Sequence, residues 1–213
     1  MGVPQNPIDS TNDRGPADFD VRHVLTMNVT WLLPFAESRT GLTGALARGW
    51  QINGLGILRS GVPFSPSIQT QNNWSRSGNV APGSEDRPNV RPGVRPEDIV
   101  RGGPTQYFDT TAFELQPQGL LGNAGRNMLT GPGLITVHLS LVKSASLRSF
   151  GNRGGIELRV EVFNAFNRTN FGVPNRVVFG AASQGDTPLP TAGQITTTAT
   201  DARQVQLGVK LRF

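Results

Sequence analysis

The chain has 213 residues and a formal charge of +5, with 26 Gly, 16 Pro and no Cys. The absence of Cys excludes disulfides and thiolate metal sites, and the absence of any run of 18 apolar residues excludes a transmembrane helix. The 20 basic residues are spread along the sequence, so the positive charge does not indicate a nucleic-acid-binding surface.

Five segments alternate between apolar and polar residues with a period of two, which is typical of β-strands. In chain order we expect strands at about 19–33, 48–61, 134–145, 155–165 and 201–213. The second segment is the weakest, because Leu55 and Ile57 fall on the parity that is polar in the other segments. Helices of no more than a turn or two are expected, at 97–101 and 105–113.

The connections between these segments alternate in length. The stretches 34–47 and 146–154 are short, whereas 62–133 and 166–200 are long, and 62–133 holds 9 of the 16 prolines. A structureless connection of this length is uncommon in a compact soluble domain, but outer-membrane barrels combine short periplasmic turns with long extracellular loops. The pattern favours an all-β, antiparallel, up-and-down transmembrane sheet whose long loops are extracellular.

In a membrane barrel the apolar side of each strand faces lipid and the polar side faces the lumen. The segments are longer than the mean strand of about 5–6 residues and suit a tilted membrane strand of about 9–11 residues. The residues predicted to face lipid are Leu25, Met27, Val29, Ile135, Val137, Leu139, Leu141, Ile156, Leu158, Val160, Val162, Val205, Leu207, Val209 and Leu211. The residues predicted to face the lumen are Arg22, Thr26, Asn28, Thr136, His138, Glu157, Arg159, Glu161, Gln206 and Lys210.

Aromatic residues gather at the ends of the predicted strands, as in the aromatic girdles of outer-membrane barrels. One rim would hold Trp31, Phe35, Trp50, Phe150 and Phe213, and the other Phe19, Phe64, Phe163 and Phe166. We single out Trp31, Trp50, Phe163 and Phe166 as girdle residues. The chain also stops on an aromatic residue at the end of an alternating strand.

Several segments resemble a known family. They are 205–213 (VQLGVKLRF), 159–172 (RVEVFNAFNRTNFG), 122–127 (GNAGRN), 131–133 (GPG) and 107–113 (YFDTTAF). The first is similar to the closing strand, and the second to the penultimate strand and following loop, of TonB-dependent outer-membrane receptors. The others resemble the Oar-like group of these receptors, which has a carboxypeptidase-regulatory-like N-terminal domain. The resemblance covers essentially the whole chain and is most specific over 105–213.

The resemblance implies a receptor in the bacterial outer membrane that binds a ligand outside the cell and imports it with energy from the TonB system. Such receptors have a barrel of about 22 strands closed around a plugged lumen. Five strands cannot close a barrel, since bacterial outer-membrane barrels have an even number of at least 8. We therefore expect residues 1–213 to be the C-terminal part of a receptor barrel, with Met1 an internal methionine or a truncated start.

The resemblance also implies partners. They are outer-membrane lipid, the TonB energy-transducing complex (through N-terminal parts and a plug absent from this chain) and the barrel-assembly machinery, which would recognise the last strand and Phe213. The transported ligand is not indicated by the sequence, and no nucleic acid is expected.

No enzyme or cofactor signature is present. The two histidines, His23 and His138, lie on different predicted strands without a cluster of further ligands, so no metal site is expected. The acidic pairs 85–86 and 97–98 lie in the long loop and lack a calcium-loop pattern. The predicted lumenal charges alternate in sign, which favours salt bridges between neighbouring strands over a charged transport path.

Two other functions share the alternation: a soluble β-sandwich binding module of a secreted or cell-surface protein, and a passive porin-like barrel. In a sandwich, Leu139, Val160, Leu207 and Val209 would be buried against a second layer, whereas a membrane sheet exposes them. For the last hairpin, placing Ala165 near Ala202 sets Glu161 opposite Gln206, Arg159 opposite Gly208 and Glu157 opposite Lys210. A shift by an odd number of residues would break the apolar side, whereas an even shift would only move these pairs.

Overall fold

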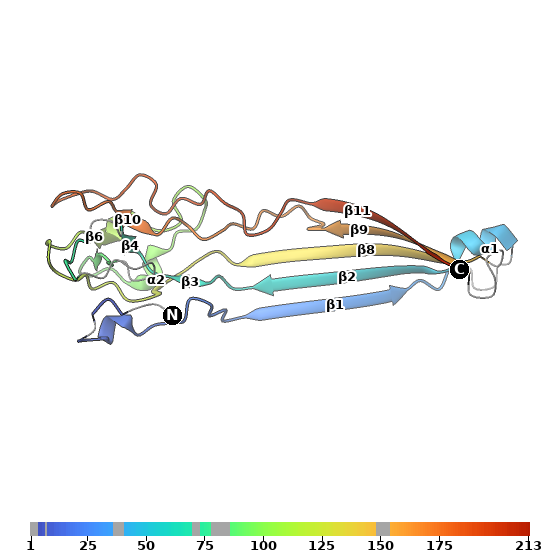
Figure 1. Cartoon of the computed structure of the whole chain (residues 1–213), viewed down its shortest axis with the longest axis horizontal. Coiled ribbons are helices and arrows are strands. Elements are labelled where there is room, and N and C mark those ends of the chain that lie inside the picture. Colours follow the sequence, from blue (N-terminus) through green and yellow to red (C-terminus); the bar gives the residue numbers. More distant parts are fainter. Residues whose placement is uncertain (1–3, 7, 36–40, 70–72, 78–85, 148–153) are drawn as a thin grey trace. The chain divides into compact units, whose positions relative to one another are not determined.

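The computed structural model describes residues 4–6, 8–35, 41–69, 73–77, 86–147 and 154–213 (Figure 1). By their internal contacts they form two compact units. The first, called here the loop unit, comprises Met1–Arg22, Ser60–Gly133 and Phe171–Ala199. The second, called the sheet unit, comprises His23–Arg59, Leu134–Asn170 and Thr200–Phe213.

The sheet unit is built on one five-stranded antiparallel sheet in the order β1-β2-β8-β9-β11. Its strands are β1 (Val24–Leu32), β2 (Trp50–Arg59), β8 (Leu134–Ser146), β9 (Gly155–Phe163) and β11 (Gln204–Arg212). These are the five expected strands, and each pairs with the next of the five along the chain. The prediction of an up-and-down sheet in chain order is confirmed.

The register of the last hairpin is also confirmed. Glu161 lies opposite Gln206, Arg159 opposite Gly208, and Glu157 opposite Lys210. The loop between β9 and β11 is too long to set the register as a tight turn would. The register therefore depends on the side chains of the two strands, because a slip by one residue would exchange their apolar and polar faces.

Two strands are shorter than the alternation predicts, because turns interrupt the extended backbone. The expected strand at 19–33 begins only at Val24. Upstream, the Asp20 N–H donates to the Ala17 carbonyl in a turn, so Phe19 and Val21 are not in the strand. Strand β9 ends at Phe163 because the next residue, Asn164, has a φ of 47° in the left-handed region.

The short connection between β1 and β2 contains a helix that the sequence pattern did not predict, α1 (Gly41–Ala47). Figure 1 shows α1 at the end of the sheet where β1 and β8 finish and where the chain's C-terminus lies. Both short connections therefore belong to one end of the sheet, and both long connections leave from the other. No helix among the described residues is long and apolar enough to cross a membrane.

The long connections are not structureless. The loop unit contains three two-stranded ladders, of which β4 with β10 is parallel and β3 with β7 and β5 with β6 are antiparallel. Its elements are η1 (Thr11–Asp13), β3 (Pro63–Phe64), β4 (Ser67–Ile68), β5 (Asn89–Val90), α2 (Pro96–Ile99), η3 (Thr110–Ala112), β6 (Phe113–Glu114), β7 (Leu129–Thr130) and β10 (Val177–Phe179). The helices α2 and η3 fall within or beside the two short helices expected at 97–101 and 105–113.

The loop unit has a hydrophobic core of its own. The Phe108 ring is fully buried and lies 5.9 Å from the Phe64 ring and 6.1 Å from the Phe113 ring, measured between centroids. The core also includes Ile68, Trp74, Ile99, Leu129, Val178 and Phe179. The expectation that Phe64 is a rim aromatic of the barrel is therefore wrong, since its ring is enclosed in this core and only 5% exposed.

A buried ion pair fastens the N-terminal segment to the rest of the loop unit. The Arg87 guanidinium donates to the Asp13 carboxylate at 2.6 Å, to Gln5 Oε1 at 2.6 Å and to the Asn12 carbonyl at 2.9 Å. Both charged side chains are almost fully enclosed. Removing one partner of such a pair leaves the other charge buried and uncompensated, so the stability of this unit depends on Arg87.

The 122–127 segment packs on the residues that follow Arg87, which include β5. A Cβ added to Gly122 would lie 1.9 Å from the Arg87 carbonyl oxygen, so only glycine fits there. Next to it, the Asn123 side chain accepts from the Val90 N–H, while the Asn89 side chain accepts from the Asn123 N–H. These reciprocal bonds explain why the segment is rich in Gly and Asn.

Candidate functional site: the two faces of the sheet

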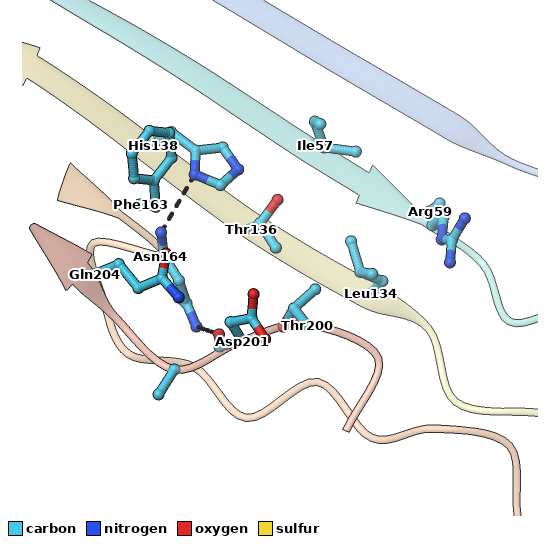
Figure 2. Close-up of a pocket in the computed structure, with 11 residues that line it drawn as sticks. Ile57, Arg59, Leu134, Thr136, His138, Phe163, Asn164, Thr200, Asp201 and Gln204 are labelled. Atoms are coloured by element: carbon cyan, nitrogen blue, oxygen red, sulfur yellow. Dashed lines mark hydrogen bonds between the residues drawn. The ribbon is translucent and has the colours of Figure 1, made fainter. Parts of the chain in front are cut away.

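The polar face of the sheet unit carries a pocket of about 470 Å³ (Figure 2). It lies over the ends of β2, β8 and β9 and the residues leading into β11. The lining residues are Ile57, Arg59, Leu134, Thr136, His138, Phe163, Asn164, Thr200, Asp201, Ala202 and Gln204. Two of the predicted lumen-facing residues, Thr136 and His138, are among them.

His138 is held in one orientation at this pocket. Its Nδ1 accepts a hydrogen bond of 3.2 Å from the Asn164 backbone N–H, so the neutral imidazole carries its proton on Nε2. The Phe163 ring lies edge-on to it, with ring centroids 5.7 Å apart, as Figure 2 also shows. The pocket therefore offers an oriented N–H donor beside an aromatic ring, with amide, hydroxyl, carboxylate and guanidinium groups around them.

Three asparagines of the 159–172 motif close this end of the sheet. Asn164 Nδ2 donates to the Arg168 and Asp201 carbonyls, each at 3.0 Å. Asn167 Oδ1 accepts from the Arg203 N–H at 2.9 Å. Asn170 Oδ1 accepts from the Ile135 N–H at 2.9 Å. We call these residues the asparagine clasp, since they join the ends of β8 and β9 to the residues that precede β11.

The charged residues on the polar face neutralise one another. Arg159 contacts Glu157 at 2.9 Å and Glu161 at 3.6 Å, and Arg212 approaches Glu157 at 4.0 Å. The expected salt bridge between neighbouring strands is found between Arg212 of β11 and Glu157 of β9, whereas both contacts of Arg159 lie within β9. Lys210 lies opposite Glu157 in the ladder, and Gln206 opposite Glu161. Thr26 and Asn28 share this face, in register with Thr136 and His138 through β2.

The other face of the sheet is apolar and exposed. The exposed fractions are 41% for Leu139, 37% for Val160, 75% for Leu207 and 68% for Val209, so no second layer of described residues covers them. The ladders place all fifteen predicted lipid-facing residues on one face, in register across β1, β8, β9 and β11. Among the described residues, the sheet is therefore not packed against a second layer as it would be in a sandwich.

Not every predicted site residue lies where the pattern placed it. Arg22 precedes β1 and belongs to the loop unit, not to the sheet. Phe163, predicted as a girdle residue, lies on the polar face of the sheet against His138. Phe166 is exposed in the turn after β9, and Phe150 lies outside the described residues.

The remaining aromatics are at the expected end of the sheet. Trp31 is 57% exposed on the apolar face of β1, and Trp50 lies on the same face of β2. Phe213, the residue after β11, is 96% exposed. The alternation did not reveal Lys143, which lies on the apolar face of β8 beside Trp50. A signal was present in the sequence, because Val142 and Lys143 reverse the polarity that the rest of β8 follows.

The carboxylates considered for metal binding have protein partners. Asp86 accepts from the Ser75 N–H and hydroxyl, and Glu97 and Asp98 both contact Arg95; Glu85 lies outside the described residues. Within the described part of the chain, no group of three or more His, Cys, Asp or Glu side chains could hold a metal ion.

The comparison with protein families bears on what surrounds the exposed apolar face. Residues 1–206 match the family model described as an outer membrane beta barrel domain. The chain belongs to this family. Comparisons with curated proteins and with solved structures give no match.

As a member of the outer-membrane barrel family, the chain is located in the bacterial outer membrane. In outer-membrane barrels the apolar side of each strand faces lipid and the polar side faces the lumen. For this chain we therefore retain two predictions: the exposed apolar face meets hydrocarbon, and the polar face, with the pocket and its His138, meets the barrel interior.

Proposed function

We propose that the chain is the C-terminal part of the barrel of a TonB-dependent receptor, which binds a ligand outside the cell and imports it with energy from the TonB system. The observation that carries this proposal is the similarity of residues 159–172 and 205–213 to the last strands of these receptors, in a chain that belongs to the outer-membrane barrel family. An enzymatic role is not proposed.

The two open edges of the sheet indicate that a closed barrel requires further strands. In the five-stranded sheet, β1 and β11 each have one neighbour, and lipid cannot satisfy the backbone groups along an open edge. The even-numbered barrels of this class contain at least 8 strands. Strands outside this sequence must therefore pair with β1 and β11, and a large plugged barrel would provide them.

The loop unit supports ligand capture. By the rule that long loops of outer-membrane barrels are extracellular, residues 60–133 and 171–199 would face the outside. The described residues of these segments share a core around Phe108 and Trp74, so they pack together instead of forming independent loops. A preformed surface binds a ligand without first losing the conformational entropy of ordering a loop.

The passive porin is the competing function, and ion conductance separates the two without knowledge of the ligand. The full-length protein would be reconstituted in a planar bilayer between KCl solutions. A plugged receptor is expected to give little steady conductance, whereas a porin gives a stable current proportional to voltage. A stable open-channel current from the intact protein would overturn the receptor proposal.

Energy coupling is tested in cells. Cells producing the full-length protein, with and without a functional TonB system, would be compared for uptake of compounds that depend on this protein. Loss of uptake with retained surface binding is expected when TonB is absent. Uptake that is equal in both strains would leave only the passive barrel.

We also propose that the exposed Phe213 belongs to a signal read by the barrel-assembly machinery. The last strand has apolar residues at every second position and an open edge, so it can add to a partner sheet with alternate side chains in pockets. Deleting Phe213 from the full-length protein should reduce the amount inserted in the outer membrane while synthesis and export to the periplasm stay normal. Wild-type levels of inserted protein, with only a lower melting temperature, would instead assign Phe213 to the aromatic girdle.

A further inference from the structure

Lys143 is a cation on the face of the sheet that meets lipid. In β8 it has the same parity as Leu139 and Leu141, and it lies opposite Trp50 of β2. A lysine on the lipid face costs about 2–4 kcal/mol at the midplane of the bilayer and about 0–1 kcal/mol near the interface. Its location at the end of the sheet keeps this cost small, and partners for its charge lower it further.

The partners of Lys143 come from helix α1. Its ammonium donates to the Ala45 carbonyl at 2.6 Å and to the Arg48 carbonyl, and it lies 5.7 Å from the centre of the Trp50 ring. The Lys143 residue is only 8% exposed. The last carbonyls of a helix have no partner within the helix, so they suit a cation, and a cation over an indole ring is further stabilised.

Two further contacts fix this end of α1 on the apolar side of the sheet. Trp50 Nε1 donates to the Leu46 carbonyl at 2.9 Å. The Ser144 N–H donates to the Gly49 carbonyl at 2.8 Å. Gly49 has a φ of 74°, and a Cβ there would lie 2.3 Å from the Ser144 carbonyl oxygen. The turn from α1 into β2 thus requires glycine and holds the helix against β8.

The position of α1 coincides with the expected edge of the hydrocarbon. From Trp50 to Leu58, β2 advances eight residues along the apolar face, or about 26 Å at about 3.3 Å per residue. With the usual tilt of about 35–45°, this is about 19–22 Å along the membrane normal, close to the apolar band of about 25 Å. Trp31, 57% exposed, lies at the same end, as expected of an interfacial aromatic.

We propose that α1 is an interfacial helix that extends the lipid-binding surface of the barrel into the headgroup region of the periplasmic leaflet. Leu46, 64% exposed, inserts at the boundary of the acyl chains, and Lys143 is the positioning residue that holds the helix there. The argument for lipid as the occupant is continuity, since α1 adjoins the apolar face through Lys143 and Trp50. The inference depends on membership of the barrel family and not on TonB or on the transported ligand.

The experiment measures the surroundings of residue 46 in the full-length protein. A nitroxide label would be attached at Leu46→Cys in a cysteine-free background, and the protein reconstituted in vesicles of phosphatidylethanolamine and phosphatidylglycerol. Power saturation compares the access of oxygen, which is concentrated in lipid, with that of a water-soluble nickel chelate. The matched references are the neighbouring positions Leu207→Cys on the lipid face and Gln206→Cys on the lumenal face.

We expect the ratio of oxygen to nickel access at position 46 to exceed that at 206 and to lie below that at 207, because position 207 is nearer the midplane of the bilayer. A ratio at 46 equal to that at 206 would place α1 in water and overturn the proposal. Lys143→Met tests the positioning role, because it removes a charge from the lipid face and keeps an unbranched side chain that is only one atom shorter. The label at 46 should then become more mobile and more accessible to nickel, while the label at 207 is unchanged and confirms an inserted barrel. An unchanged signal at 46 in this variant would refute the role of Lys143.

Discussion

The two units of this chain bury opposite kinds of surface. In the loop unit, Phe108 and Ile99 are fully buried, as in any protein whose surroundings are water. In the sheet unit, Leu207 and Val209 are among the most exposed residues, at 75% and 68%. Apolar side chains in both units follow the same rule, that they leave water. The two units differ in where the apolar environment lies. In the loop unit it is the interior of the unit, and in the sheet unit it is the surroundings of the sheet.

The largest effect is expected from Phe108→Ala in the loop unit. This ring contacts Phe64 and Phe113, and its loss leaves a cavity that costs about 3–5 kcal/mol. The matched variant, Leu207→Ala, removes a side chain that contacts lipid, and lipid can fill the space. Hydrogen exchange of the full-length protein in vesicles should therefore accelerate in the loop unit for Phe108→Ala and change little for Leu207→Ala. Equal effects of the two variants would contradict the comparison.

The second prediction places a charge on either face of β11. Leu207 and Gln206 are neighbours near the middle of this strand and point to opposite sides. Leu207→Arg should destabilise the inserted barrel by about 2–4 kcal/mol, because the guanidinium would lie near the midplane of the hydrocarbon. Gln206→Arg, on the lumenal face beside Glu161, should cost much less. Urea unfolding in vesicles measures both, and a larger loss for Gln206→Arg would reverse the assignment of the faces.

The third prediction concerns the asparagine clasp, at the end of the sheet from which both long connections leave. Asn164→Ala removes the bonds to the Asp201 and Arg168 carbonyls, and leaving buried partners unsatisfied costs about 1–3 kcal/mol. It also places a Cβ-bearing residue without a polar side chain at a φ of 47°. Asn164→Gly is the control, since it tolerates this φ but makes neither bond.

If the clasp acts through its hydrogen bonds, both variants should accelerate hydrogen exchange in the first residues of β11. Restoration of the wild-type rate by Asn164→Gly would show instead that Asn164 serves only to adopt the turn. In either variant, the pairs Glu161–Gln206 and Glu157–Lys210 should persist, because the apolar face would be broken by a slip of one residue.

The sheet was predictable because its information is local and periodic. The alternation of β9 and β11 fixes which residues share a face, and the continuity of that face then excludes every register shifted by an odd number of residues. The strand ends were not predictable, because they depend on single side chains such as Asn164, which begins a turn where the apolar pattern could have continued. Lys143 and α1 were missed for a related reason: the partners of Lys143 lie about 95 residues away in the sequence, and no periodicity connects them.

The loop unit was beyond the reach of the same reasoning. Its ladders are two or three residues long. The parallel pair of β4 and β10 joins Ser67 to Val177, and both β8 and β9 lie between these two residues in the sequence. Short strands of this kind carry too few residues for a pattern. The signal that did exist was compositional, because nine prolines and repeated Gly-containing turns between 62 and 133 mark many changes of chain direction but not which segments meet.

The smallest expected effect is a pH dependence in the loop unit, where Asp109 caps η3. Its carboxylate accepts from the Thr111 N–H at 2.9 Å and the Thr111 hydroxyl at 2.6 Å, and it also binds Arg101. Burial raises the pKa of Asp109, but the bonds from Thr111 and Arg101 outweigh it, so the pKa lies below the ordinary value of 3.8. The charged form is therefore favoured by folding.

This lowered pKa fixes the sign of the effect. The stabilisation is fully present above the unfolded-state pKa and is lost as the pH falls through the lower folded-state pKa. Asp109→Asn keeps a capping side chain but removes the charge, so its cost at neutral pH should be about 0.2–1 kcal/mol, given that Arg101 is half exposed and screened. The gap between wild type and variant, measured by hydrogen exchange around 109–113, should close on acidification. A gap that persists at a pH below the folded-state pKa would show that Asp109 acts through the shape of its side chain and not through its charge.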